Sequence, residues 1–204
     1  LDPRGIGESR GTYGDLTLHD LAADAAGVIE ALVPMPVWVV GHGFGNRVAR
    51  CLAEDAPQCV RGLILLGAGG HVPPTATALA AFRVILQDTM GSREWCAAVQ
   101  TANFASGFDP SPWFTGWWLE TARQQVAVTR ATPVEHWWKG GNAPMLVIQG
   151  LEDQMAPPGN GRLLQEGFPG RVELAELAAA GHALLPEQPQ AVAATLISYL
   201  NRNL

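Results

Sequence analysis

The chain has 204 residues, of which 48% are hydrophobic and 16% are charged, and its formal net charge is −6 at pH 7. This length is enough for one domain, or for one domain with an inserted subdomain, to bury a hydrophobic core. Lys139 is the only lysine and no basic cluster is present, so we expect no nucleic-acid partner. No apolar run approaches the ~20 residues that cross a bilayer, so we expect no membrane span.

The three cysteines, Cys51, Cys59 and Cys96, form no C-x-x-C pair and no spacing typical of zinc or of a disulfide framework. We therefore expect free, mostly buried thiols and no metal site. Reduced cysteines favour a cytoplasmic location.

The first elements are a loop and an amphipathic helix. Residues 1–9 form a glycine-rich loop, and from Thr17 the apolar residues recur at intervals of three and four up to Leu32. Thr17 and Asp20 are spaced as a capping pair. This pattern predicts a helix that packs on a sheet.

A buried strand is predicted over residues 37–40, which read Val-Trp-Val-Val. It leads into Gly41-His42-Gly43-Phe44-Gly45 and then directly into a helix over 46–55. A second apolar strand follows over 62–66. Runs that are apolar throughout are typical of parallel strands covered on both faces.

Residues 71–142 show no alternation of strands and helices, and six of the seven tryptophans fall here: Trp95, Trp113, Trp117, Trp118, Trp137 and Trp138. We predict a helical cap over the sheet. Its rings either line an apolar substrate pocket or hold a small subdomain together. The candidate pocket residues are His42, Trp113, Trp117, Trp118 and Trp137.

An apolar segment over 145–148 predicts another strand. Gly150 follows it, and Asp153 comes three residues after Gly150. A last strand around 172–174 leads to Gly181-His182, and a final helix begins near Pro189.

Four of these segments, taken together and in order, resemble the α/β-hydrolase family. They are the opening loop, the elbow around Gly43, the G-x-x-D that ends at Asp153, and Gly181-His182 with its trailing E-x-P. The resemblance implies a partial α/β-hydrolase fold, mainly a parallel sheet that lacks the family's first strands. Residues 1–70 and 143–204 would form the core, and 71–142 the helical cap.

By this resemblance Asp153 is the acid and His182 the base of a catalytic triad, and Gly43 stands where the family has its nucleophilic serine. The backbone N–H of Phe44 would be one donor of the oxyanion hole. Glu152 is the alternative acid. We expect His42 to pack beside the turn rather than to act as a base.

The residue types suit this chemistry. A carboxylate that accepts one imidazole N–H fixes the tautomer and leaves the other ring nitrogen free to take a proton. At the centre of the elbow, the strained backbone conformation costs a residue with a side chain about 1–3 kcal/mol of stability. Gly43 avoids this strain, but it also lacks the nucleophilic hydroxyl group. The three glycines do not make a dinucleotide-binding loop, because Asn46 holds the third glycine position.

Three functions remain open from the sequence. The first is slow, promiscuous carboxylic ester hydrolysis, in which His182 and Asp153 activate water. The others are a non-catalytic ligand-binding pseudoenzyme, and proton abstraction of the lyase or cofactor-free oxygenase type. No cofactor is expected. The partners expected are a small apolar ester-like substrate and a second copy of the chain, in a homodimer or higher oligomer that covers the sheet edge at 37–40.

Overall fold

The structure, a computed structural model, describes residues 1–203. The helices and strands follow in the order α1 (Leu18–Leu32), β1 (Val37–His42), α2 (Phe44–Asp55), η1 (Pro57–Cys59), β2 (Val60–Leu66), α3 (Ala76–Ile85), α4 (Arg93–Asn103), η2 (Ser111–Trp113), α5 (Leu119–Ala131), η3 (Val134–His136), β3 (Met145–Gly150), α6 (Gly159–Gly167), β4 (Val172–Leu177), α7 (Leu184–Glu187) and α8 (Pro189–Asn203). Within the described residues, no helix combines the length and the apolar character that a membrane crossing needs.

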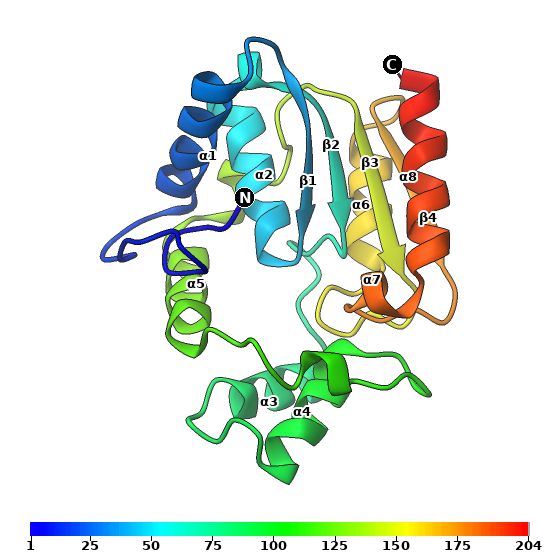
Figure 1. Ribbon diagram of the computed structural model, residues 1–204. Helices are drawn as coiled ribbons and strands as arrows, with labels where there is room; N and C mark the ends of the chain where they lie inside the picture. Colours follow the sequence, from blue (N-terminus) through cyan, green and yellow to red (C-terminus); the bar gives the residue numbers. More distant parts are fainter. Residues whose placement is uncertain (204) are drawn as a thin grey trace.

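The four strands form one parallel sheet in the order β1-β2-β3-β4. Each connection between neighbouring strands includes a helix, as parallel pairing requires. The carboxyl ends of all four strands therefore meet at one edge of the sheet. Figure 1 shows this edge facing the helices α3 and α4.

Residues along β2 alternate between the two faces of the sheet. Leu63 and Leu65 belong to the buried cluster that includes residues of α1 and α2, whereas Ile64 and Leu66 belong to the cluster that includes residues of α7 and α8. All four side chains are at most 2% exposed. The sheet is thus covered on both faces, which confirms the predicted α/β class.

The start of α1 is fixed by the predicted capping pair. The Asp20 carboxylate accepts a hydrogen bond from the backbone N–H of Thr17 at 2.8 Å, so an otherwise unpaired donor at the helix start is satisfied. Leu18, Leu21 and Ala22 then bury the first turns of the helix against the core.

The helices between β2 and β3 divide into two groups. Ile85, Trp95, Val99 and Phe104 form a separate buried cluster, which we call the core of the α3–α4 unit. By contrast, Val128 of α5 belongs to the main core. The predicted cap at 71–142 therefore packs as a separate unit only up to the start of α5.

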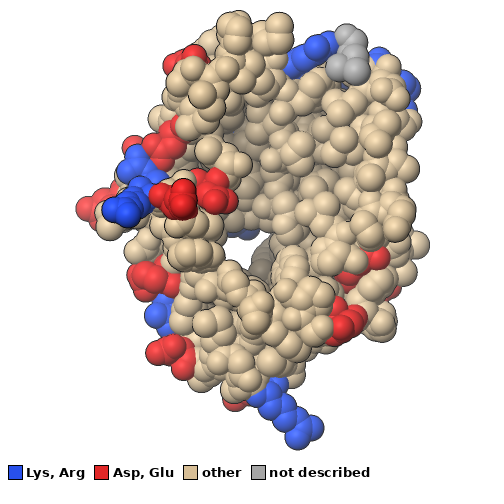
Figure 2. All heavy atoms as spheres, viewed as in Figure 1, with Lys and Arg blue, Asp and Glu red and all other residues tan. Residues whose placement is uncertain are grey.

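β1 lies at one edge of the described sheet, and Val40 on it is 53% exposed. A groove of about 800 Å³ runs along this edge; its lining includes Val39 of β1, Val28 of α1 and Val48 of α2. Figure 2 shows the molecule hollowed on this face, and the lining of the groove also includes the charged residues Asp2, Arg4, Arg10 and Asp24.

Candidate active site

His182 and Asp153 come from loops that follow different strands and meet at the carboxyl edge of the sheet. His182 Nδ1–H donates to Asp153 Oδ2 at 2.8 Å, and the backbone N–H of Ala156 donates to Asp153 Oδ1 at 2.7 Å. The Asp153 residue is only 3% exposed. A buried carboxylate held in this way fixes the imidazole tautomer that leaves Nε2 unprotonated.

Gly43 lies directly opposite this free nitrogen. Its backbone has φ 53° and ψ −114°, it caps α2, and its N–H donates to Leu66 O at 3.2 Å. A Cβ placed on Gly43 would lie 3.1 Å from His182 Nε2. His182 Nε2 therefore faces Gly43, the position at which the family resemblance expects a serine.

Phe44 is the first residue of α2. The N–H groups in the first turn of a helix have no acceptor inside the helix, and they concentrate its positive end. The N–H of Phe44, next to Gly43, therefore has no acceptor within α2.

His42 ends β1 and lies against the catalytic loop. Its Nε2–H donates to the backbone carbonyl oxygen of His182 at 2.7 Å, and the two rings are 5.0 Å apart. Burial, with the neighbouring His182 adding to it, lowers the pKa of His42 to about 4. His42 is thus a neutral hydrogen-bond donor at neutral pH, and it supports the loop that carries the base.

This burial predicts a pH-dependent stability. Between pH 6.5 and about 4 the unfolded chain protonates His42 while the folded chain does not, so stability falls as the pH falls. The difference of about 2.5 pKa units corresponds to about 3 kcal/mol. The free energy of unfolding, measured with urea, should fall between pH 7 and pH 4 in both proteins. The fall should be about 3 kcal/mol smaller in His42→Asn than in the parent. Equal losses in the two proteins would refute the assignment.

Gln149 supports Asp153 from beneath. The side chain is fully buried at the end of β3, where Nε2 donates to Asp153 Oδ2 at 3.3 Å and to Ala156 O at 2.6 Å. Its Oε1 accepts from Ala68 N at 3.0 Å. The amide therefore joins the turn after β2 to the turn that carries the acid.

Gly67 lies under the contact between the acid and the base. It has φ +59°, and a Cβ there would lie 3.1 Å from His182 Nδ1 and 3.2 Å from Asp153 Oδ2. Only a residue without a side chain leaves room for this hydrogen bond. The sequence pattern gave no sign of this role.

Asn46 ties together the two turns that form the floor. Its Nδ2 donates to Gly43 O at 2.6 Å and to Gly67 O at 3.1 Å, and its Oδ1 accepts from Arg50 Nη2 at 2.5 Å. Arg50 also donates to Gly69 O and stacks its guanidinium 4.5 Å from the Trp137 ring. Burial lowers the pKa of Arg50 to about 9, so it is still a cation at neutral pH.

Removing the Asn46 side chain should cost far more stability than a surface substitution. Asn46→Ala leaves two buried carbonyl groups and one Arg50 donor short of a partner, and each such group costs about 1–3 kcal/mol. We expect urea unfolding to show a loss of about 3 kcal/mol or more. Gln124→Ala, an exposed amide on α5, is the control and should change stability by less than about 0.5 kcal/mol; similar losses in both variants would contradict the role.

The loop that carries His182 is fastened to the end of α4. The buried Glu187 carboxylate accepts from the backbone N–H of Ala105 and of Gly181, both at 2.6 Å, and burial raises its pKa. Ala183 N donates to Asn103 O at 2.8 Å. Glu187 is the acid of the trailing E-x-P, so its motif was visible in the sequence while its partners were not.

Glu152, the alternative acid, is exposed, and its carboxylate accepts from the backbone N–H of Ser106 at 3.4 Å. The hydrogen bond to the His182 ring comes from Asp153. The geometry therefore favours Asp153 as the partner of the base.

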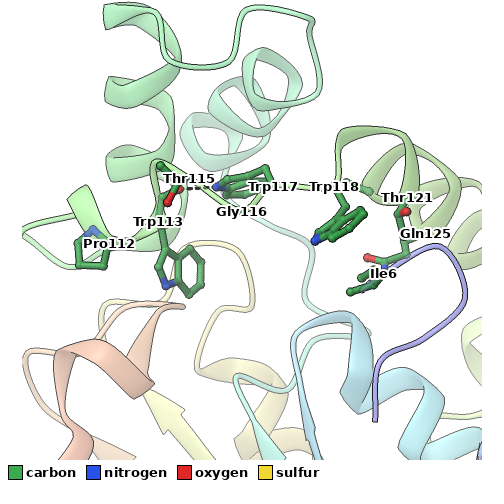
Figure 3. A pocket seen from close by; sticks show the side chains of 10 residues that line it. Ile6, Pro112, Trp113, Thr115, Gly116, Trp117, Trp118, Thr121 and Gln125 are labelled. Carbon is green, nitrogen blue, oxygen red and sulfur yellow. Dashed lines mark hydrogen bonds between the residues drawn. The ribbon is translucent and has the colours of Figure 1, made fainter. Parts of the chain in front are cut away.

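An aromatic pocket of about 330 Å³ lies beside the site, and Figure 3 shows its lining. Trp113, Trp117 and Trp118 contribute rings from the segment before α5, and Thr121 lines it from α5 itself. Trp113 also approaches the His42 ring, with centroids 6.4 Å apart. Trp137 is buried beneath Arg50 and lies outside this pocket.

The model of the alpha/beta hydrolase family matches residues 1–195. The chain belongs to that family. The match covers nearly the whole sequence, including the elbow and both members of the His182–Asp153 pair, so the predicted family and fold are confirmed.

Individual relatives agree with this family assignment. The chain is 26% identical to "Putative non-heme bromoperoxidase BpoC" of Mycobacterium tuberculosis, over 98% of this chain and 80% of that protein. It is 28% identical to a 2-hydroxymuconate semialdehyde hydrolase of Pseudomonas sp., over 65% of this chain and 51% of that protein. The esterase EaEST from Exiguobacterium antarcticum has the same fold, with a TM-score of 0.77 at 22% identity over 98% of this chain and 80% of that one.

Proposed function

We propose that this α/β-hydrolase is a slow, promiscuous carboxylic ester hydrolase in which His182, held by Asp153, activates water. The observation that carries the proposal is the position of His182 Nε2, 3.1 Å from where a Cβ of Gly43 would lie. The base therefore faces the place from which a nucleophile attacks in this family. A water molecule bound there needs no side chain at position 43.

The reaction balances with these groups alone. Water attacks the ester carbonyl carbon as Nε2 takes one of its protons, and the tetrahedral oxyanion forms beside the N–H of Phe44. The C–O bond to the alcohol then breaks, and the imidazolium returns the proton to the departing oxygen. Asp153 stabilises the imidazolium between these two steps.

The magnitudes explain why turnover should be slow. A positioned general base contributes roughly a hundred- to ten-thousand-fold. Loss of the nucleophile from a complete triad costs about a million-fold. Esters with good leaving groups should therefore be the substrates that this site hydrolyses at a measurable rate.

The aromatic pocket favours apolar substrates. None of the described residues that line it is charged, and the rings of Trp113, Trp117 and Trp118 provide broad apolar surface. Apolar pockets with a few polar groups are the usual form of small-molecule sites. A small aryl or alkyl ester fits both this lining and the nearby base.

The test is hydrolysis of short-chain aryl esters by the parent, His182→Ala and Asp153→Asn. We expect His182→Ala to lose roughly a hundred-fold or more, and Asp153→Asn to lose most of the same activity because the tautomer is no longer fixed. His71→Ala, which changes an exposed histidine in edge-to-face contact with Trp138, serves as the control and should retain the parent rate. Equal rates for the parent and His182→Ala would reject the proposal.

A non-catalytic binding protein is the second candidate, because Gly43 removes the nucleophile while the aromatic pocket is kept. An aryl ester that quenches tryptophan fluorescence without yielding any acid or alcohol product would establish this alternative. The proton-abstraction candidate rests on the His182–Asp153 pair alone.

A second copy of the chain is the partner that we propose for the edge of β1. Val40 is 53% exposed there, and an unpaired strand edge is a template for pairing. We expect light scattering at micromolar concentration to give a dimer or larger species, and Val40→Lys to shift it toward the monomer. A stable parent monomer would contradict this. All three cysteines are free, which agrees with the proposed cytoplasmic location.

A further inference from the structure

Three polar side chains meet on the surface, away from the catalytic pair. His19 lies in the first turn of α1, Asp55 is the last residue of α2, and His136 ends η3. His19 Nδ1 lies 2.7 Å from Asp55 Oδ2, and His19 Nε2 lies 3.4 Å from His136 Nδ1. The proposed ester hydrolysis uses none of these groups.

The hydrogen bond to Asp55 determines which nitrogen of His19 is free. A carboxylate only accepts, so Nδ1 of His19 carries the proton and Nε2 presents its lone pair toward His136. Metal-binding histidines commonly have this arrangement, in which the second ring nitrogen donates to a carboxylate that orients the ring.

The spacing of the two facing nitrogens suits one metal ion. Two imidazole nitrogens at Zn–N distances of 2.0–2.1 Å in a tetrahedral site are about 3.3–3.4 Å apart. The two nitrogens are 3.4 Å apart, and in the metal-free protein His136 Nδ1–H donates a hydrogen bond to His19 Nε2 across this distance. A bound ion would replace that proton, which is released to solvent. The His19 side chain is 37% exposed, so an ion reaches it from solvent without unfolding of the chain.

We propose that His19 and His136 form a two-histidine site for Zn²⁺ or a similar divalent transition-metal ion, with Asp55 as the carboxylate that orients His19. Among residues 1–203, no group of three or more His, Cys, Asp or Glu side chains is arranged around a metal position. Water therefore completes the coordination. Imidazole ligands suit zinc, copper and nickel rather than magnesium or calcium.

A metal ion here would join two distant segments of the sequence. His19 begins the first helix of the core, whereas His136 directly precedes Trp137, whose ring stacks on Arg50. An ion bound by both histidines fixes η3 to α1. Because the unfolded chain does not hold the two rings together, binding stabilises the folded state.

The test is calorimetric titration with Zn²⁺ as the only added ligand. We expect the parent to bind one ion per chain. His19→Ala and His136→Ala should each lose a hundred-fold or more in affinity. Asp55→Asn, which keeps both rings, should lose about 10- to 100-fold. His71→Ala should bind as the parent does. The His182→Ala variant should also bind Zn²⁺ normally, which distinguishes this site from the catalytic pair.

A thermal measurement gives a second readout. Saturating Zn²⁺ should raise the Tm of the parent by about 2–4 °C for each kcal/mol of stabilisation, and should leave the Tm of the His19→Ala/His136→Ala double variant unchanged. The proposal is wrong if the double variant binds Zn²⁺ within two-fold of the parent, or if His182→Ala is the variant that abolishes binding.

Discussion

Gly43→Ser should accelerate aryl ester hydrolysis by about a thousand-fold and should change the mechanism from water attack to acyl transfer. A serine at position 43 would face His182 Nε2 directly. The nucleophile of a complete triad is worth about a million-fold, whereas the general base that the parent is proposed to use supplies roughly a hundred- to ten-thousand-fold. Mass spectrometry of the reaction should then detect an acyl group on the peptide that carries the substitution, and rapid kinetics should show a burst of alcohol.

The same substitution should destabilise the fold. The positive φ of Gly43 costs a side chain about 1–3 kcal/mol, and the Cβ contact at 3.1 Å requires the His182 ring to shift by a few tenths of an ångström. Gly43→Ala is the matched control, because it carries the same strain and the same contact without a hydroxyl group. We expect Gly43→Ala to be no faster than the parent; a rate increase in both variants would show that the gain does not come from a nucleophile.

Gly67→Ala should abolish the activity that depends on His182, although it replaces neither His182 nor Asp153. The new Cβ would lie 3.1 Å from His182 Nδ1 and 3.2 Å from Asp153 Oδ2, and so would separate the two groups. We expect the rate to fall about as far as in Asp153→Asn, roughly a hundred-fold. Stability should fall by about 1–3 kcal/mol, because φ is +59°.

Gly14→Ala isolates the effect of backbone strain. Gly14 also has a positive φ, of +48°, but among residues 1–203 no atom outside Gly14 and its two chain neighbours lies within 4 Å of the position of its Cβ. Urea unfolding should show that Gly14→Ala loses about as much stability as Gly67→Ala does. Gly14→Ala should still hydrolyse esters at the parent rate. If Gly67→Ala hydrolyses esters as fast as Gly14→Ala does, the contact between the acid and the base is not what drives the reaction.

The sequence predicted those parts of the site that depend on local pattern. The elbow around Gly43 follows an apolar strand and precedes a helix, and Asp153 and His182 follow strands in the family's order. Because parallel strands end at one edge of the sheet, motifs at their carboxyl ends predict which residues converge. The covered sheet and the start of α1 follow from periodicity in the same way.

The parts that could not be predicted depend on contacts between distant segments. Asn46 was visible only as a break in a glycine pattern, yet its amide reaches two turns at once. Gln149, a polar residue directly after an apolar strand, was the better clue to a buried hydrogen-bond network. Trp137 shows the opposite case: composition placed it in the cap, whereas its ring packs in the main core beneath Arg50.

The loop that carries His182 is fastened to the α3–α4 unit rather than to the sheet alone. Ala183 belongs to the hydrophobic cluster of that unit, and Glu187 bridges the peptides at Ala105 and Gly181. Any movement of the unit relative to the sheet would therefore also shift His182 relative to Gly43.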